Sequence, residues 1–485
     1  MKTRKLFLTV PVLAVVLSMG ACGEGGGGSD PVPTHDWTDV ETVEMSEDFA
    51  GSGNIKVWVG KESVEFYQAE AAKWIAAHQS NPEFKFTVTV EAHDSGSVAG
   101  DLENDATVCA DIFTAAHDNV GKLAQEKLAK PFYSKNLVDQ IENDNSAEFF
   151  EVAHSVVDKQ RAVYGAPYIA QSLFLMYDKR YVTETQAQTF EGLSEAAAAR
   201  NSRTKAIVVT GQDGFNYSFP LLAQNNETHA TTMKIYKDGD KKDCWAQGED
   251  SVANLQWARR YYANPNGLTW PSSSGWQTDV NEGGAIALIS GSWNYNSFAS
   301  AIGETNVGVG MIPTFTLTEE DVAGTTQKAG TVMRGGTFGD CKVFMINAKS
   351  EGPKYVAEQS LIKYLSTKEV QQGSLKSCDN LPSYKGASQY VETIKDELGV
   401  SKYKLAKAQI NMAAYSIPQP FTDGTLNSYF YSKGAPNLYA MVTENTDGKY
   451  GTTQAAREIL YRMQHIWEKG KDPEKTIPAT LPAEI

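Results

Sequence analysis

Residues 55–91 alternate between strand and helix patterns in a way that few folds can accommodate. Ile55–Val59 is a short apolar run typical of a buried strand. From Ser63, the predicted helix cap, to Gln79, apolar residues recur every three or four positions, as on one buried helix face. Phe84–Glu91 then alternates strictly between apolar and polar residues, as expected of a second strand. A strand, a helix and a strand at this spacing indicate parallel pairing with a right-handed crossover.

The same alternation continues along the rest of the chain. Further strands are predicted at 110–114, 206–209, 285–289, 307–311 and 343–347, and further helices at 119–128, 217–224, 252–262, 294–302 and 459–467. A second α/β region begins after Ala166-Pro167, and the strand at 343–347 returns to the first region. Two α/β regions joined by several crossings predict a hinge, with a ligand held at the carboxyl ends of the strands.

The first residues have the pattern of an export signal. A basic start is followed by a short apolar stretch, a pair of small residues and a cysteine: Lys2, Arg4, Lys5, Leu6–Met19, Gly20-Ala21 and Cys22. Such a segment is removed on export. The final cysteine resembles that of a bacterial lipobox, in which it is acylated, although Met19 stands where Leu is usual. We therefore expect an exported protein anchored to the outer face of the cell membrane by lipid on Cys22; the alternative is a plain secretory signal.

Residues 22–53 are predicted to be a flexible tether. The segment contains Gly25–Ser29, four glycines closed by a serine, followed by Pro31 and Pro33. A Gly/Ser-rich chain of about 30 residues behaves as a coil that spans roughly 30 Å. No later stretch is apolar enough to cross a membrane. The globular part is therefore expected to be held away from the membrane surface by this segment.

The charge of the chain excludes some partners. Its net charge is −15, and loss of three basic residues with the signal lowers it to about −18. An acidic chain without a basic stripe argues against binding to nucleic acid and against direct docking on anionic lipid. The length suggests two or three domains. We expect a monomer.

The sequence carries no recognisable catalytic, metal or cofactor motif. It lacks a GxSxG elbow, a P-loop and a dinucleotide fingerprint, and its histidines and cysteines have no metal-ligand spacing. We therefore predict a protein that is not an enzyme and needs no cofactor, although a pair of glycosidase carboxylates cannot be recognised from sequence. The cysteines beyond Cys22 are Cys109, Cys244, Cys341 and Cys378. Cys341 with Cys378 is the candidate disulfide, and the connectivity stays open.

Aromatic residues in loops after strands suggest sugar binding, because a flat ring can stack on the apolar face of a sugar. Trp293 follows the apolar strand at 285–289 directly, and Tyr429 and Phe430 lie in a polar segment. Asp118 lies where a strand meets a helix. For each residue an ordinary structural role stays open: core packing for the aromatics, and a helix N-cap for Asp118.

Several segments, in order and spacing, resemble family 1 extracellular solute-binding proteins, and within them the maltose/maltodextrin-binding proteins. The matching segments are 57–63 (VWVGKES), 111–113 with 117–121, 166–168 leading to 175–179 (LMYDK), 289–293 (ISGSW), 309–313 (VGMIP) and 364–369 (YLSTKE). The resemblance covers nearly everything from Ile55 onward. It implies an α/β, periplasmic-binding-protein-like type II fold: two discontinuous lobes with a hinge and a ligand cleft.

The resemblance also implies a division of the chain. The expected parts are a lipoprotein signal peptide (1–21), the tether (22–53), the first part of lobe 1 (54–167), the first part of lobe 2 (168–313), a return to lobe 1 (314–380) and a helical remainder, mostly in lobe 2 (381–485).

Site residues follow from the same resemblance. Those implied to contact a sugar are Lys61, Glu62, Asp118, Asn119, Gln171, Asp213, Phe215, Trp293, Tyr429 and Phe430. Three features depart from the maltose binders: Asn119 stands where they have Arg, Gln171 where they have Glu, and Ala115-Ala116 where a Trp is expected. These departures weigh against maltose itself, and they leave the identity of the oligosaccharide open.

The sequence thus predicts a receptor that captures a carbohydrate and delivers it to the permease subunits of an ABC transporter. Closure on ligand would give the transporter a distinct liganded shape to recognise. Two alternatives stay open: a surface lipoprotein that adheres to glycans without a transporter, and a glycoside-active enzyme.

Overall fold

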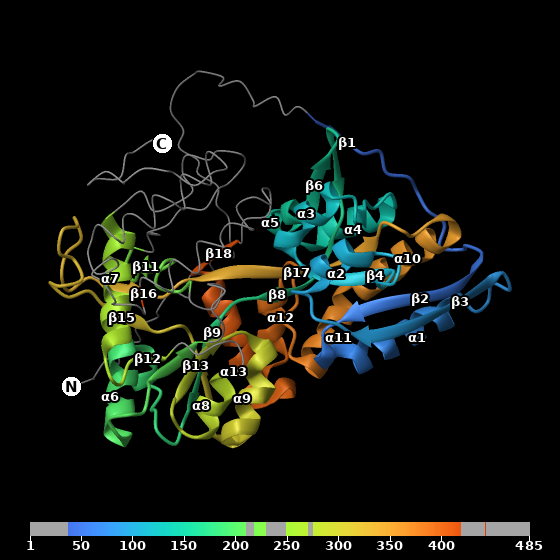
Figure 1. Ribbon diagram of the computed structural model, residues 1–485. Coiled ribbons are helices and arrows are strands. Elements are labelled where there is room, and N and C mark those ends of the chain that lie inside the picture. The colour runs from blue at the N-terminus through green and yellow to red at the C-terminus, as the bar shows by residue number, and fades with distance from the viewer. Residues whose placement is uncertain (1–36, 210–217, 229–248, 270–274, 419–441, 443–485) are drawn as a thin grey trace, which may run out of the picture. The chain divides into compact units, whose positions relative to one another are not determined.

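The structure, a computed structural model, describes residues 37–209, 218–228, 249–269, 275–418 and Val442. The unit that begins at Thr38 contains two α/β lobes, each with a β-sheet and an apolar core of its own (Figure 1). Among the described helices, none combines the length and the apolar character needed to cross a membrane.

A seven-stranded mixed sheet forms the centre of the first lobe. Its strands are β2 (Gly51–Val59), β3 (Phe84–Ala92), β4 (Ile112–Ala116), β5 (Ala129–Lys130), β8 (Ala166–Gln171), β17 (Thr337–Asn347) and β18 (Ser416–Pro418). β2 pairs in parallel with β3 and β4, as predicted. β17 runs antiparallel to β4, β5 and β8, and its first residues pair in parallel with β18. The alternation predicted for β3 is confirmed, because Phe84, Phe86, Val88 and Val90 are buried and the polar residues between them are exposed.

Helices cover both faces of this sheet. α1 (Val64–His78) and α10 (Gly352–Leu365) pack on one face, and α2 (Val98–Asp105) and α3 (Val120–Gln125) on the other. The register of β17 shows the division: Phe344 faces the first core, whereas Val343 faces the second. Burial on both faces explains why the strands read as nearly continuous apolar runs. The lobe also contains α4 (Lys135–Asp144), α5 (Ala147–Val152) and α11 (Lys368–Cys378).

Residues 38–48 form an N-terminal strap along the first lobe. β1 (Thr38–Asp39) pairs in parallel with β7 (Gln160–Val163), which forms a hairpin with β6 (His154–Val157). Further along, the Val43 N–H donates to the Tyr133 carbonyl at 2.8 Å. The flexible tether was predicted to run to residue 53, and that boundary is wrong. Backbone pairing and scattered apolar contacts, such as that of Phe49 with Trp74, order this segment, and neither leaves a regular apolar period in the sequence.

The second lobe has a five-stranded sheet. Its strands are β9 (Phe174–Asp178), β10 (Ile207–Val209), β12 (Leu268–Thr269), β13 (Ala287–Ser290) and β14 (Val307–Gly310), and its helices include α6 (Phe190–Arg200), α7 (Glu249–Ala263), α8 (Trp276–Asn281) and α9 (Tyr295–Ile302). β10 is parallel to β12 and β13, whereas β9 is antiparallel to β13 and β14. Most predicted elements of this region are therefore confirmed.

The helix predicted at 217–224 is wrong. The described residues from Ser218 make a single turn, closed by the Leu222 N–H on the Ser218 carbonyl at 2.9 Å, and β11 (Gln224–Asn225) follows. Pro220 accounts for the difference, because it lacks an N–H and disfavours helical geometry in the residue before it.

The segment 314–336 stays with the second lobe. β15 (Thr314–Thr316) and β16 (Val332–Arg334) form a small sheet with β11, and Phe315 and Met333 are buried in the second lobe's core. The predicted return to lobe 1 at residue 314 is therefore too early, since β17 begins only at Thr337. The polar, glycine-rich composition of this segment suggested a change of lobe. In the structure the segment contributes β15 and β16 to a small sheet of the second lobe.

The first crossing between the lobes lies at residues 171–174. β8 ends at Gln171 and β9 begins at Phe174, so the predicted boundary after residue 167 falls inside β8. Side chains and backbone hold the crossing: the Ser172 hydroxyl donates to the Gln409 carbonyl at 3.1 Å, and the Leu173 N–H donates to the Thr337 hydroxyl at 3.3 Å.

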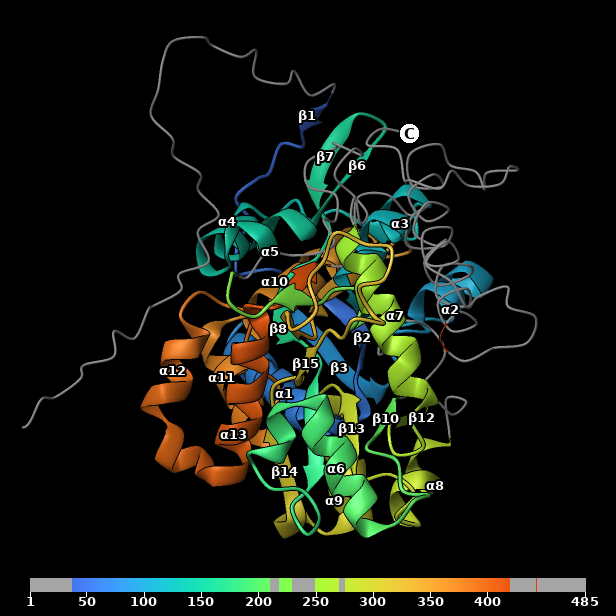
Figure 2. The same ribbon diagram turned by 90° about the vertical axis from the view of Figure 1, so that its left-hand side faces the viewer.

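The described part of the C-terminal region is helical up to β18. α11, α12 (Ala387–Thr393) and α13 (Lys395–Ala413) lie next to one another (Figure 2) and share a small core that includes Leu375, Val391 and Leu398. α13 also contacts β9 and β14 of the second lobe. The helix predicted at 459–467 lies outside the described residues.

Cys341 and Cys378, the candidate pair whose disulfide state the sequence left open, are not bonded to each other. Cys109, Cys341 and Cys378 are all thiols, and Cys341 is fully buried in β17. Burial raises the pKa of the Cys378 thiol. Cys244 and Cys22 lie outside the described residues.

Candidate functional site

Three loops of the two lobes share one construction: a strand, a single 3₁₀ turn and a helix. β2 leads through η1 (Lys61–Ser63) into α1, β4 leads through η2 (His117–Asn119) into α3, and β13 leads through η5 (Ser292–Asn294) into α9. All three turns begin at or one residue beyond the carboxyl end of a strand, where ligands bind in α/β folds. Five of the predicted site residues lie in these turns.

The backbone follows nearly the same path through all three loops. The last turn residues, Ser63, Asn119 and Asn294, have φ/ψ of −110/−4°, −89/−11° and −99/−1°. The helix then begins with φ/ψ of −57/−52°, −58/−50° and −57/−51°. The middle residues of the turns are Glu62, Asp118 and Trp293, which therefore occupy equivalent positions.

Two of these loops are neighbours in the first lobe. β2 and β4 are adjacent parallel strands, with Val57 opposite Ile112 and Trp58 opposite Phe113. Parallel strands end at the same edge of a sheet, so η1 and η2 emerge together. A hydrogen bond also fixes η1: the buried Ser63 hydroxyl accepts from the Asn380 amide at 3.1 Å instead of capping α1. Lys61 and Glu62 are exposed.

Asp118 is buried within its turn. It is 6% exposed, and its Oδ1 accepts a hydrogen bond from the Asn119 amide at 3.1 Å. The interpretation of Asp118 as a helix N-cap is wrong, because Asn119 occupies the N-cap position and makes no side-chain capping bond. The neighbouring His117 is also buried, and its Nδ1 accepts from the Cys341 N–H at 3.1 Å. The η2 loop is thus attached to β17.

Gln171 has an unusual environment at the end of β8. The residue is 7% exposed, and its Oε1 has no hydrogen-bond partner among the described residues. Buried polar atoms in native proteins are nearly always hydrogen-bonded. An acceptor that lacks a partner among the described residues, at the start of the crossing between lobes, is consistent with the predicted contact to a sugar hydroxyl.

Trp293 is not a core residue. It is 37% exposed, whereas β13, which precedes it, is fully buried. Exposure of a large indole at the end of a buried strand favours a binding role over the core packing that the sequence left open. Among the residues outside the described ranges are Asp213, Phe215, Tyr429 and Phe430, whose predicted roles stay predictions.

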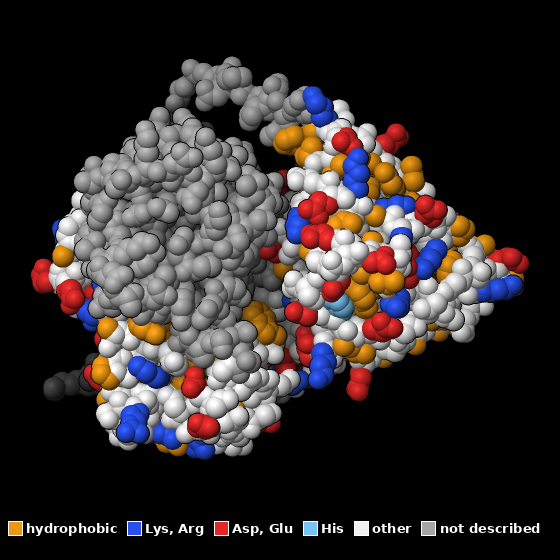
Figure 3. Space-filling model, viewed as in Figure 1, with side chains coloured by type: hydrophobic (Ala, Val, Ile, Leu, Met, Phe, Trp, Pro, Cys, Tyr) orange, Lys and Arg blue, Asp and Glu red, His pale blue; other side chains and the backbone are white. Residues whose placement is uncertain are grey.

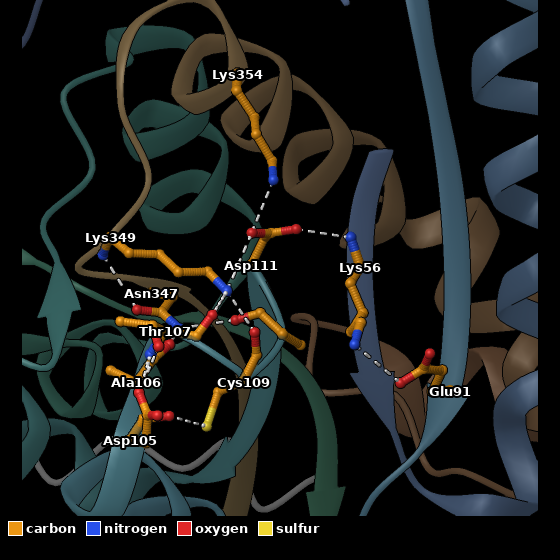
Figure 4. Close-up of polar contacts among 11 residues, drawn as sticks. Lys56, Glu91, Asp105, Ala106, Thr107, Cys109, Asp111, Asn347, Lys349 and Lys354 are labelled. Carbon is orange, nitrogen blue, oxygen red and sulfur yellow. Dashed lines mark hydrogen bonds and ion pairs between the residues drawn. The ribbon is translucent and has the colours of Figure 1, made fainter. Parts of the chain in front are cut away.

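The opposite, amino-terminal edge of the β2–β4 sheet holds a polar network of another kind (Figure 4). Asp111, one residue before β4, accepts from the Lys56 N–H at 2.8 Å and forms ion pairs with Lys354 at 2.8 Å and Lys349 at 3.5 Å. Asn347 at the end of β17 donates to the carbonyls of Ala106 and Ala110, each at 2.9 Å. These contacts join backbone segments to each other, as expected of a structural network.

On the visible described face, acidic and basic side chains are interspersed without a field of one sign (Figure 3). The described part of the chain contains no group of three His, Cys, Asp or Glu residues that could hold a metal ion.

Sequence reasoning missed the importance of two glycines, Gly60 and Gly291, which precede η1 and η5. A Cβ on Gly60 would overlap the carboxylate of Glu62, and a Cβ on Gly291 would overlap the indole of Trp293. The detectable signal is a glycine directly after an apolar strand, two residues before the predicted ligand-binding side chain.

Solved structures define the class of fold. The maltodextrin binding protein MalE1 from L. casei BL23, without ligand, matches with a TM-score of 0.63 and 19% identity, covering 85% of this chain and 99% of that one. MalX from Streptococcus pneumoniae, in complex with maltopentaose, matches with a TM-score of 0.61 and 20% identity over the same shares of the two chains. The protein therefore has the type II periplasmic-binding-protein fold.

The family follows from the sequence. A family profile described as bacterial extracellular solute-binding protein matches residues 73–402, and the chain belongs to that family. A maltooligosaccharide ABC transporter solute-binding lipoprotein of Streptococcus pneumoniae strain R6 is 26% identical over 373 residues, which cover 74% of this chain and 79% of the relative. A galactooligosaccharide-binding protein of Bacillus subtilis strain 168 is 21% identical over 460 residues, covering 91% and 93%.

Proposed function

We propose that the protein captures a linear oligosaccharide, of the maltooligosaccharide class, outside the cell and delivers it to the permease of an ABC transporter. The observation that carries the proposal is the exposed Trp293 in a turn equivalent to those of Glu62 and Asp118. An aromatic face supplies stacking, and carboxylates supply acceptors for sugar hydroxyls. The names of the relatives support this ligand class.

The residues proposed to bind the ligand are distributed over both lobes. Glu62 and Asp118 belong to the first lobe, and Trp293 belongs to the second. A ligand that contacts both lobes binds the closed state more tightly than the open state, and so shifts the population toward closure. Gln171, at the crossing between them, offers its buried Oε1 as an additional acceptor.

The first test is calorimetric titration of the chain lacking residues 1–22 with maltopentaose, a galactooligosaccharide and glucose. We expect saturable binding of one oligosaccharide, and recovery of that glycan intact. In Trp293→Ala, affinity should fall by roughly tenfold or more, since aromatic stacking and burial contribute about 1–2 kcal/mol. Cleaved glycan would support the enzyme alternative, and binding of none of the three would refute the ligand class.

The membrane attachment needs a separate test. We propose that Cys22 carries the lipid and that the mature protein is a monomer. The supporting observations are the signal pattern before Cys22 and the description of the pneumococcal relative as a lipoprotein. Cells producing the full chain should yield a lipid-labelled product that partitions into detergent, and Cys22→Ser should abolish the label. Light scattering of the form lacking residues 1–22 should give the mass of one chain.

A further inference from the structure

Gly291 is the residue before η5, and the position that a Cβ would occupy on it faces the ring of Trp293. A Cβ built on Gly291 would overlap three atoms of the six-membered ring, Cε3, Cζ3 and Cη2. The indole therefore lies directly over the backbone of Gly291, in space that any other residue would fill. Trp293 itself stays 37% exposed, so this contact holds the ring without burying it in the core.

The backbone of Gly291 does not require glycine. Its φ/ψ of −93/179° is extended geometry that alanine adopts freely. The presence of glycine in a loop is usually explained by a positive φ, which only glycine adopts easily. Gly291 has a negative φ, so that explanation does not apply. The remaining reason for its presence is the close approach of the indole.

The other two loops provide an internal comparison. Gly60, before η1, has φ/ψ of −56/144°, and a Cβ there would overlap the carboxylate of Glu62. Ala116, before η2, has φ/ψ of −69/144° and carries a Cβ. The loop whose middle residue is Asp118 therefore carries a Cβ at this position, whereas the loops of Glu62 and Trp293 carry glycine.

We propose that Gly291 is a positioning residue, which sets the orientation of the Trp293 indole for stacking on the sugar. The absence of a side chain on Gly291 leaves room for the six-membered ring of Trp293 beside the end of β13. A methyl group at this position displaces the ring and so changes the stacking face that the ligand meets. This inference rests on the proposed function, because it assumes that Trp293 contacts the carbohydrate.

The test is a double-mutant cycle with Gly291→Ala and Trp293→Ala, measured as the Kd for maltopentaose in the purified exported protein. We expect Gly291→Ala to raise Kd by roughly tenfold, about as much as Trp293→Ala, because both remove the same stacked ring. In the Trp293→Ala background, Gly291→Ala should change Kd by less than about twofold, because interacting residues are not additive. Gly310→Ala, in β14 of the same sheet, is the matched control: its Cβ would meet no atom within 4 Å.

A second readout needs no ligand. With 5-fluorotryptophan incorporated, the fluorine resonance of Trp293 is assigned by its loss in Trp293→Ala. Gly291→Ala should shift that resonance and leave the others in place, while Gly310→Ala should shift none. An unshifted resonance, or equal losses of affinity from Gly291→Ala in both backgrounds, would overturn the inference. If wild-type protein binds no sugar, the proposed function fails, and the fluorine spectrum still decides whether Gly291 orients the ring.

Discussion

The backbone N–H of Cys341 donates a hydrogen bond to Nδ1 of His117 at 3.1 Å, deep within the first lobe. An N–H can only donate, so Nδ1 must accept, and the imidazole is therefore neutral with its proton on Nε2. The contact joins the middle of β17 to the turn that carries Asp118. The order of a turn that is predicted to bind ligand thus depends on a strand that lies more than two hundred residues later in the chain.

Replacing His117 should therefore affect both stability and binding. His117→Ala leaves the buried Cys341 N–H without an acceptor, which costs about 1–3 kcal/mol in the free energy of unfolding. It also loosens the turn of Asp118, so affinity for maltopentaose should fall. His117→Asn places an amide oxygen near the position of Nδ1 and should recover part of both losses. Urea denaturation measures the stability and calorimetry the affinity. Equal losses in His117→Ala and His117→Asn would contradict the role of Nδ1 as the acceptor for the Cys341 N–H.

Asp111 should matter for stability and not for ligand affinity. It is 5% exposed and joins β2 to α10 at the edge of the sheet opposite the predicted ligand loops. Asp111→Ala should lower the free energy of unfolding by about 1–3 kcal/mol, because the Lys56 N–H loses its acceptor and the partly exposed Lys354 loses its ion pair. Asp111→Asn keeps an acceptor for the Lys56 N–H and should lose less. Affinity for maltopentaose should stay within about twofold in Asp111→Asn; a larger loss would show that the two edges of the sheet are coupled.

Glu358 should make stability fall as the pH rises from mildly acid to mildly alkaline. This carboxyl group of α10 is fully buried, and burial raises its pKa to about 8, with the charge of Asp111 adding to the effect against the opposing Lys354 and Lys130. Between pH 4.5 and 8 the folded protein holds a proton that the unfolded chain releases. Its contribution to stability therefore decreases as the pH rises, by at most about 1.4 kcal/mol per pH unit.

Glu358→Gln isolates this contribution. The amide stays neutral at every pH, so the variant should show a shallower decline of stability from pH 5 to pH 8, and should be more stable than wild type at pH 8. Urea denaturation at several pH values measures both slopes. If the free energy of unfolding fell equally with pH in wild type and Glu358→Gln, Glu358 would have to be ionised in the folded state.

The unpartnered acceptor of Gln171 gives opposite expectations for stability and binding. Gln171→Met keeps the length of the side chain and removes a buried oxygen that has no partner among the described residues. Ligand-free stability should be unchanged or rise by up to about 1 kcal/mol, since an unsatisfied buried polar atom is unfavourable. Affinity for maltopentaose should fall at the same time. Loss of stability without loss of affinity would place Gln171 in a structural hydrogen bond instead of the site.

The elements with strong periodicity were predictable from the sequence, and the connections between lobes were not. α1, α9 and β3 have clear apolar periods and appear where expected. β17 was expected at 343–347 but begins at Thr337, because its first residues are ordered by pairing with β8 and β18. Such pairing involves residues far apart in the chain and leaves no local pattern.

The site was predictable in outline only. The resemblance selected the turns of Glu62, Asp118 and Trp293, and the structure shows that they share one backbone path. Their individual environments depend on tertiary contacts, such as the hydrogen bond between His117 and Cys341. The closeness of Gly291 to the indole of Trp293 could not be predicted either. Glycine is common after a strand, and the sequence does not show which side chain lies against it.

The N-terminal strap has a mechanical consequence. A chain pulled from its N-terminus transmits the force first to the pairing of Thr38–Asp39 with β7, and then to the hydrogen bonds of Val43. All of these contacts lie in the first lobe, ahead of the crossing at 171–174. Tension applied ahead of Thr38 would therefore be borne by the first lobe, leaving the crossing at 171–174 unloaded and the second lobe unaffected by the pull.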